Sequence, residues 1–405
     1  MAPINQPYTL PCGETLSNRM AKAALTERLA DPSHLPNEKH IELYRTWAAG
    51  GAGMLLSGNI LIDERYLEAA GNVVAHRLSP EEPFKAWTKV VTDTNTHFWA
   101  QINHAGRQST IFSTFQPVSA SDVQLKKMGL FAKPRPLKES EIEDIIQRFV
   151  DTAVFCRRVG FTGVQFHAAH GYLFNQFLSP KTNLRTDKWG GPIENRARLL
   201  LTVMDKSRKA LGHEFPISVK LNSADFQRGG FNEEDALYVI RELEKRGLDL
   251  LEISGGTYEN VTFFTQEGLK ESTRQREAYF LDFAKEVRQI TGTPIMVTGG
   301  FRTLNFCNKV LENNELDIIG FGRPFLLHDD FAEGFLNGTL EKVSDPVINS
   351  PLASYYDMAV AGYYDYQIER LATGKKLNLN YKGWQAIGRM TKNEMWKGFR
   401  NRVPF

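Results

Sequence analysis

Short runs of β-branched and other apolar residues alternate along the chain with longer segments of helical periodicity. Each of the later runs is followed by a polar or glycine-bearing turn and then by a helix candidate; these runs cover residues 216–222, 248–254, 293–300 and 316–322. Earlier strand candidates cover residues 18–24, 53–60, 97–102 and 162–167. This alternation is typical of repeated βα units, which form a parallel sheet covered by helices.

The segments between the strand candidates each have one apolar face. The segment that begins at Glu194 keeps its apolar residues on one side of a helix, and those that begin at Glu233 and Arg276 do the same and end at glycine. Eight parallel strands with intervening helices predict a closed (β/α)8 TIM barrel. The alternative is an open, doubly wound sheet, which is weakened because no G-x-G-x-x-G sequence follows an early strand.

Two segments exceed what a bare barrel needs. A long loop from Ser113 to Glu139 follows the third strand, and such loops at the C-terminal ends of barrel strands usually cover the active site. An aromatic-rich tail follows the last βα unit, so we expect a barrel in residues 1–345 and a helical extension in residues 346–405. The extension either packs on its own barrel or docks on a neighbouring subunit, which leaves both a monomer and a homo-oligomer open.

Composition and charge exclude several classes of function. The 405 residues carry 49 basic and 47 acidic side chains, and a formal charge of +2 creates no field that would attract nucleic acid or an anionic membrane. The three cysteines are widely spaced and suggest neither a disulfide framework nor a zinc knuckle. With no apolar stretch of signal-peptide or membrane-span length, we expect a cytoplasmic protein.

In a TIM barrel the active site lies where the strands end, so the residues at those ends are the candidates for chemistry. They are mostly hydrogen-bonding groups and glycines, with almost no carboxylate, which argues against paired-carboxylate chemistry and against a carboxylate-rich metal cage. The last two ends read TGGF and GFGRP, and they predict a phosphate-binding cradle made by Gly299, Gly300, Gly322 and Arg323. The alternative is that these glycines only make tight turns.

His167, His170 and Tyr172 follow the fourth strand candidate and allow three interpretations. As zinc ligands the histidines lack the glutamate of an H-E-x-x-H helix, because Ala168 follows His167. As core histidines they would be bonded to backbone groups. As paired donors they would hold a carbonyl or nitro oxygen and withdraw charge from it, with Tyr172 as a nearby acid. The third interpretation requires a hydride donor, which a protein supplies as a flavin or a nicotinamide.

The stretch FHAAHGYLFNQFLSPKTNLRTDKWGGPIENRARLLL closely resembles the signature of the old yellow enzyme family, the FMN-dependent ene-reductases. The segments TLSNRMAKAALTE, AQINHAGRQ, VKLNSADF, TGGFRT and GFGRPFLLHDD support the resemblance in the same order. The similarity spans about Thr15 to Gly338, so only the C-terminal tail lies outside it.

The resemblance implies FMN as the cofactor and assigns residues to its ring. Thr26 matches the donor to the flavin O4, and Ala24 and Asn59 match residues along the edge of the ring. Gln101 matches the amide that reads the pyrimidine end. Lys220 matches the position beside flavin N1 and O2, where the family mostly has an arginine, and Ala24 replaces a frequent proline. Both replacements bear on cofactor affinity and reduction potential.

The resemblance also implies a reaction. His167 and His170 match the pair that grips the activating oxygen of the substrate, and Tyr172 matches the proton donor. The expected activity is a ping-pong reduction, in which NADPH or NADH reduces FMN and an α,β-unsaturated carbonyl or nitro compound then accepts the hydride. The alternative functions are those of a metal-dependent hydrolase or lyase barrel and of a non-catalytic flavin-binding protein. Candidate walls of the substrate pocket are Phe131, Tyr258, Phe263 and Phe264, although each of them could equally anchor its loop.

Overall fold

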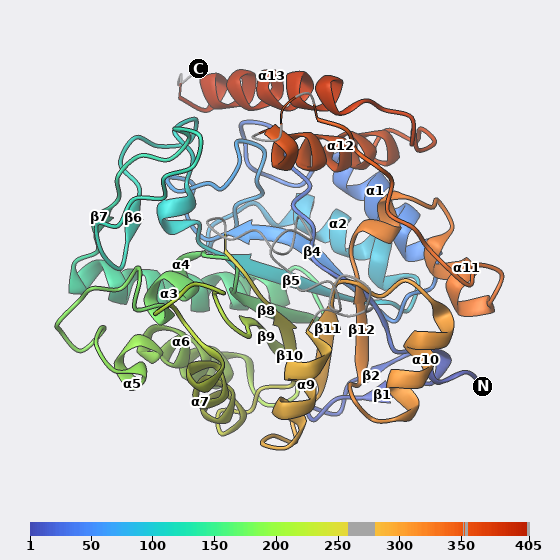
Figure 1. Cartoon of the computed structure of the whole chain (residues 1–405), viewed down its shortest axis with the longest axis horizontal. Helices are drawn as coiled ribbons and strands as arrows, with labels where there is room; N and C mark the ends of the chain where they lie inside the picture. Colours follow the sequence, from blue (N-terminus) through green and yellow to red (C-terminus); the bar gives the residue numbers. More distant parts are fainter. Residues whose placement is uncertain (258–279, 351, 353–354, 403–405) are drawn as a thin grey trace.

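The computed structural model describes residues 1–257, 280–350, 352 and 355–402. Its centre is a closed barrel of eight parallel strands in the order β10-β11-β12-β3-β4-β5-β8-β9 (Figure 1). The strands are β3 (Met20–Lys22), β4 (Met54–Leu61), β5 (His97–Asn103), β8 (Gly163–Ala168), β9 (Ile217–Asn222), β10 (Leu250–Ser254), β11 (Ile295–Thr298) and β12 (Ile318–Phe321). All the strand candidates are therefore confirmed, and the open-sheet alternative is wrong because β12 pairs with β3 and closes the ring.

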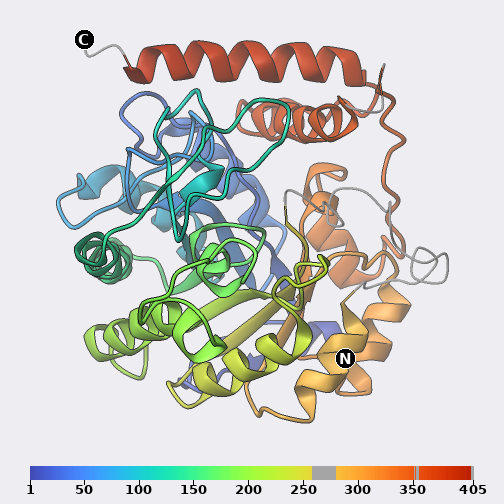
Figure 2. The same ribbon diagram turned by 60° about the vertical axis from the view of Figure 1, so that its left-hand side comes forward.

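Helices surround the barrel and connect its strands (Figures 1 and 2). They are α1 (Glu38–Ala49), α2 (Glu81–Thr92), α3 (Glu139–Arg158), α4 (Leu173–Leu178), α5 (Ile193–Arg196), α6 (Arg198–Leu211), α7 (Glu233–Glu244), α9 (Leu281–Arg288), α10 (Leu304–Glu312) and α11 (Phe331–Asn337). The helix expected from Glu194 is divided at Ala197 between α5 and α6. The first residues of the helix expected from Arg276 lie outside the described residues, which resume at Phe280.

Short elements complete the chain. They are the helical turns η1 (Pro3–Asn5), η2 (Gly106–Gln108) and η3 (Arg323–Leu326), the hairpin β1 (Tyr8–Thr9) and β2 (Thr15–Leu16), and the pair β6 (Val118–Ser119) and β7 (Arg135–Pro136) in the loop after β5. Leu10 and Leu16 of the hairpin region pack with apolar side chains from inside the barrel, including Met54 and Trp99. The hairpin therefore closes the end of the barrel where the strands begin.

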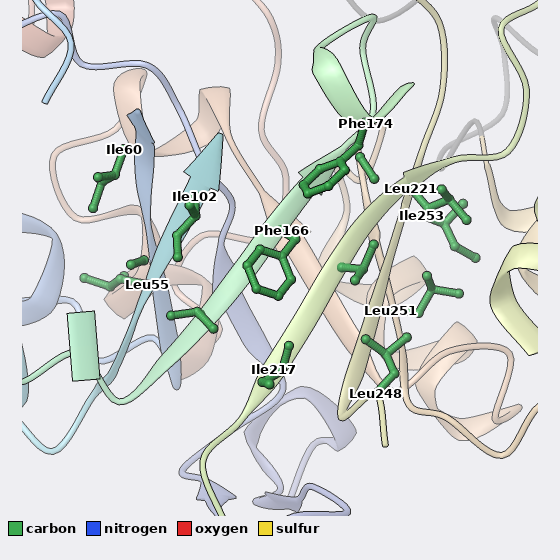
Figure 3. Close-up of a cluster of buried hydrophobic side chains, with 14 of the residues drawn as sticks. Leu55, Ile60, Ile102, Phe166, Phe174, Ile217, Leu221, Leu248, Leu251 and Ile253 are labelled. Atoms are coloured by element: carbon green, nitrogen blue, oxygen red, sulfur yellow. The ribbon is translucent and has the colours of Figure 1, made fainter. Parts of the chain in front are cut away.

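The two faces of each strand have different partners. Figure 3 shows Ile102, Phe166, Leu221 and Ile253 on neighbouring strands, where they belong to the large core between the barrel and its helices. Since successive side chains alternate across a strand, the residues next to them point into the barrel. The interior is apolar near the strand starts and polar near the strand ends, so the fold places polar groups at the rim where ligands bind.

The C-terminal extension forms two helices, α12 (Tyr356–Leu371) and α13 (Gly383–Arg402), which lie together at the top of Figure 1. Helix α12 contacts α1 and η3 of the barrel, and α13 packs on α12. Their close crossing requires a glycine at position 362, because a Cβ there would lie 2.5 Å from the carbonyl oxygen of Ala386. Among the described residues, no helix combines the length and hydropathy needed to cross a membrane.

Candidate active site

A cavity of about 330 Å³ lies at the C-terminal ends of the barrel strands. Every residue predicted from the sequence as catalytic or cofactor-binding lines it: Ala24, Thr26, Asn59, Gln101, His167, His170, Tyr172, Lys220, Gly299, Gly300, Gly322 and Arg323. These residues come from positions that span 300 residues of chain, and the closed barrel brings their strand ends to one rim.

The two histidines and the tyrosine form a compact group at the end of β8. The ring of His167 lies 5.1 Å from that of His170 and 4.7 Å from that of Tyr172, with the rings nearly perpendicular in both pairs. His167 and Tyr172 are buried, with 4% and 5% of their surface exposed. Burial, followed by the nearby Lys220 ammonium, lowers the pKa of both imidazoles well below the ordinary value. Both histidines are therefore neutral near pH 7 and can donate hydrogen bonds without carrying charge.

His170 is held in an uncommon backbone conformation. Its φ of 60° lies in the left-handed region, which costs a non-glycine residue about 1 kcal/mol or more and persists when neighbouring contacts enforce it. Its backbone N–H donates to Asn222 Oδ1 at 3.2 Å, and its Nε2 lies 2.7 Å from Ser254 Oγ. The ends of β9 and β10 thus fix both the backbone and the ring of His170.

A zinc site at the histidine pair finds no support in the described part of the chain, where no three His, Cys, Asp or Glu side chains gather as a metal would need. The lowered pKa values of His167 and His170 are those expected of neutral imidazoles that act as hydrogen-bond donors in a cavity lined by protein. Two imidazoles and one phenol lie close together and line the same cavity.

A polar chain crosses the barrel interior below this group. Gln101 Nε2 donates to Gln165 Oε1 at 2.8 Å, and Gln165 Nε2 donates to Glu252 Oε2 at 2.8 Å. The other carboxylate oxygen, Glu252 Oε1, lies 2.8 Å from Lys220 Nζ. Four neighbouring strands, β5, β8, β9 and β10, each supply one member, and Lys220 stands directly opposite Glu252 in the strand pairing.

Hydrogen-bonding groups on β4 and the loop after β3 continue this polar lining, since Asn59 stands opposite Gln101 in the pairing of β4 with β5. Thr26 Oγ1 donates to Asn59 Oδ1 at 3.1 Å, and Asn72 Nδ2 donates to the same oxygen at 3.3 Å. Asn59 Nδ2 is buried, and no acceptor for it is found among the described residues. Such a donor at a cavity wall fits a bound molecule with carbonyl or ring-nitrogen acceptors, such as the flavin ring of FMN.

The residues of the predicted phosphate cradle lie together on the cavity wall. Gly299 and Gly300 have φ values of 114° and 88°, a backbone conformation that favours glycine. Arg323 lies at the same part of the cavity wall, 5.7 Å from the ring centre of Tyr364. Asp345 Oδ2 accepts from Arg302 at 2.5 Å and lies 3.9 Å from Arg323. Glycine amides with two guanidinium groups fit the phosphate of FMN.

The C-terminal extension contributes one face of α12 to the cavity. The lining residues Ala361, Tyr364, Asp365 and Ile368 follow the i, i+3, i+4, i+7 spacing of a single helical face. Helix α13 also reaches the rim, since Lys397 Nζ donates to the carbonyl oxygen of Arg28, another lining residue. The wall therefore includes residues beyond position 345, which the sequence analysis did not assign to the site.

Sequence reasoning missed Gln165 and Glu252, which lie two residues before strand-end residues that it did identify. Alternation along the strands was the signal that could have found them, because residues two apart share the interior face. No residue of the loop after β5 is among the described residues that line this cavity, so the expectation that the loop covers the active site stays a prediction. The loop is described throughout, and its residues Val123 and Gln124 line a separate cavity of about 160 Å³.

Phe131, offered as a wall residue, anchors its loop instead. It is buried outside the cavity lining, and its carbonyl oxygen accepts a hydrogen bond from Gln124 at 2.8 Å. The other candidate wall residues, Tyr258, Phe263 and Phe264, lie outside the described residues.

Comparison with known proteins agrees with the fold. The model of the NADH:flavin oxidoreductase / NADH oxidase family matches residues 4–339. The chain belongs to this family. It is therefore an NAD(P)H-dependent flavin oxidoreductase with FMN as its cofactor and NADH or NADPH as its reductant.

Individual relatives of this flavin oxidoreductase differ in length. The chain is 36% identical over 352 residues to the NADH-dependent flavin oxidoreductase iliE of Neonectria sp., covering 80% of this chain and 45% of that protein. It is 34% identical over 371 residues to iliE of Hypocrea jecorina, covering 85% and 92%. Among solved structures, the old yellow enzyme homologue from Zymomonas mobilis superposes with a TM-score of 0.71 at 25% identity, over 87% of this chain and 98% of that one.

Proposed function

We propose that this flavin oxidoreductase is an ene-reductase that saturates the C=C bond of α,β-unsaturated carbonyl or nitro compounds. The observation that carries the proposal is the group of His167, His170 and Tyr172, two neutral imidazoles and a phenol, on the wall of the same cavity as the candidate flavin residues. Bound FMN supplies a hydride, taken from NADPH or NADH, to the β-carbon of the substrate.

In this proposal the residues of the chain hold the cofactor and activate the substrate. Thr26, Asn59 and Gln101 offer hydrogen bonds to the flavin ring, with Ala24 along its edge and Lys220 as a cation beside it. Gly299, Gly300, Gly322 and Arg323 would hold the phosphate of FMN. All of these residues line the same cavity. The Nδ2 group of Asn59, which has no acceptor among the described residues, could donate a hydrogen bond to the flavin ring.

The histidines lower the barrier because they act on charge that appears during the reaction. The carbonyl or nitro oxygen gains negative charge as the β-carbon is reduced, and two fixed donors stabilise that state more than the ground state. Tyr172 donates its phenolic proton to the α-carbon, which completes the reduction. The depressed pKa values keep the imidazoles neutral, so the site does not depend on protonating them.

We also propose that residues 346–405 serve the cavity of their own chain and that residues 1–345 form the catalytic barrel. The face of α12 that lines the cavity and the bond from Lys397 to Arg28 support this assignment.

The test uses the flavin spectrum of the purified holoenzyme. Anaerobic NADPH should bleach the bound flavin, and cyclohexenone should restore the oxidised spectrum. In Tyr172→Phe the bleaching should proceed at an unchanged rate, while recovery slows by about 10²-fold or more, the scale of lost acid catalysis. Equal loss in both steps would refute the proton-donor role. A flavin that NADPH does not reduce would indicate a non-catalytic binding protein, and inactivation by chelators would favour a metal enzyme.

A further inference from the structure

The buried carboxylate of Glu252 pairs with Lys220 inside the barrel. Glu252 lies in the middle of β10, and its side chain is fully buried, while 6% of the Lys220 side chain is exposed. The two charged atoms, Oε1 and Nζ, are 2.8 Å apart. A carboxylate in this position needs a partner, since burying an unpaired charge is costly. Nothing in the strand-end pattern requires a carboxylate two residues below the rim.

The second carboxylate oxygen determines the orientation of two amides. Gln165 Nε2 donates both to Glu252 Oε2 and to Ser218 Oγ, at 2.8 and 3.1 Å, so both of its amide hydrogens have acceptors. Its Oε1 must then accept, and Gln101 Nε2 donates to it at 2.8 Å. The carboxylate of Glu252 accepts hydrogen bonds and cannot donate them, so it fixes the direction of the whole chain up to the cavity-lining Gln101.

The charge on Lys220 acts on the cavity. Lys220 lines the wall, and its ammonium contributes to the lowered pKa of both His167 and His170. The carboxylate 2.8 Å behind it offsets part of that positive field in a region shielded from solvent. The field at the cavity is therefore that of a pair and is weaker than the field of a lone cation.

We propose that Glu252 is a positioning residue that sets the strength of the Lys220 charge and the orientation of Gln101 toward FMN, and so sets the reduction potential of the bound flavin. The inference rests on the proposed function, in which Lys220 stands beside the flavin ring. A reduced flavin carries more negative charge than an oxidised one, so a lone cation would stabilise it more. By weakening that cation, Glu252 favours release of the hydride to substrate over its acceptance from NADPH.

The test is Glu252→Gln in the full-length holoenzyme, read by the reduction potential of FMN. We expect binding of reduced FMN to tighten relative to oxidised FMN by about tenfold, which equals a rise of about 30 mV for a two-electron couple. Reduction by NADPH should become faster and reoxidation by cyclohexenone slower. If Glu252 has only a structural role, its replacement should slow both half-reactions and leave the reduction potential of FMN unchanged.

The control is Asp249→Asn. Asp249 directly precedes β10 and forms a buried pair with Arg208 at 2.6 Å, with 5% and 8% of the side chains exposed, at the end of the barrel away from the cavity. Removing this carboxylate should leave the flavin potential unchanged. An unchanged potential in Glu252→Gln, or an equal shift in Asp249→Asn, would overturn the inference while the ene-reductase proposal stands. A wild-type protein that NADPH does not reduce would instead overturn the proposed function.

If the lone buried lysine prevents Glu252→Gln from folding or from binding FMN, a second variant tests the inference. Lys220→Met combined with Glu252→Gln removes both charges and leaves no unpaired ion. Its flavin potential should lie at or below that of the wild type, because the cation that stabilises the reduced ring is gone. A potential raised above that of the wild type would show that Glu252 does not act through Lys220 and would overturn the inference.

Discussion

Removing the hydroxyl that holds His170 is the sharpest way to test the proposed oxygen clamp. Ser254 Oγ lies 2.7 Å from His170 Nε2, and Ser254 is buried, with 4% of its surface exposed. In Ser254→Ala the ring loses this contact, whereas the backbone of His170 keeps its bond to Asn222 at 3.2 Å. We therefore expect a misoriented imidazole in a folded protein.

The expected slowing of flavin reoxidation in Ser254→Ala lies between two limits. A hydrogen bond of this kind contributes about 0.5–1.5 kcal/mol, which sets the smallest expected effect. Complete loss of one donor to a developing oxyanion costs about 2.7–4 kcal/mol, which sets the largest. Ser254→Ala should lie between them, with reoxidation by cyclohexenone slowed about 5- to 50-fold, while His170→Ala should approach the upper limit.

The assay is rapid-mixing absorbance of the flavin, with each half-reaction followed separately. Reduction by NADPH should change little in Ser254→Ala, because that step does not use the oxygen clamp. Ser223→Ala is a suitable control, since Ser223 is as buried, at 2%, follows the neighbouring strand β9 and does not line the cavity. Faster reoxidation in Ser254→Ala, or equal slowing of both half-reactions, would show that Ser254 does not position His170 for substrate.

Three further predictions follow from other parts of the structure. Because the pKa values of His167 and His170 lie well below the ordinary value of about 6.5, kcat/KM for cyclohexenone should show no inflection between about pH 6 and 8; a break near pH 6.5 would contradict neutral imidazoles. Gly299→Ala places a side chain at a φ of 114° and should weaken FMN binding about tenfold or more by fluorescence titration, whereas Gly338→Ala, also at a positive φ of 80° but outside the cavity lining, should not. Burial lowers the pKa of Lys22 to about 7, so between that value and about 10.5 the unfolded chain binds more protons and the free energy of unfolding rises with pH. Urea unfolding at pH 7 and 9 should show that Lys22→Met removes about 2 kcal/mol of this rise. An identical pH dependence in the variant and the wild type would refute the assignment.

Much of the site could be predicted because barrel strands end at a common rim. His167 follows Phe166 in β8, and Lys220 precedes Leu221 in β9; in each case a polar residue stands beside an apolar one that faces the outer core (Figure 3). Local alternation therefore separates interior from exterior residues without knowledge of the partners. The closed barrel then brings these ends together, whatever their separation in sequence.

The contacts between those residues could not be predicted in the same way. Glu252 meets Lys220 because β9 and β10 pair in a register that sets these two residues opposite each other, and neither strand alone contains that information. His170 contacts Ser254 for a similar reason, across 84 residues of chain.

The sequence by itself determined the order of βα units and the polar groups at the strand ends, because both follow from patterns within a few residues. The tertiary structure decided which of these groups touch, and it placed Tyr364 and Asp365 of the C-terminal extension on the cavity wall. Those two residues are polar and lie on a helix outside the barrel, so no strand pattern includes them. The physical reason is that strand pairing and helix docking act between distant segments, whereas side-chain alternation acts along one segment.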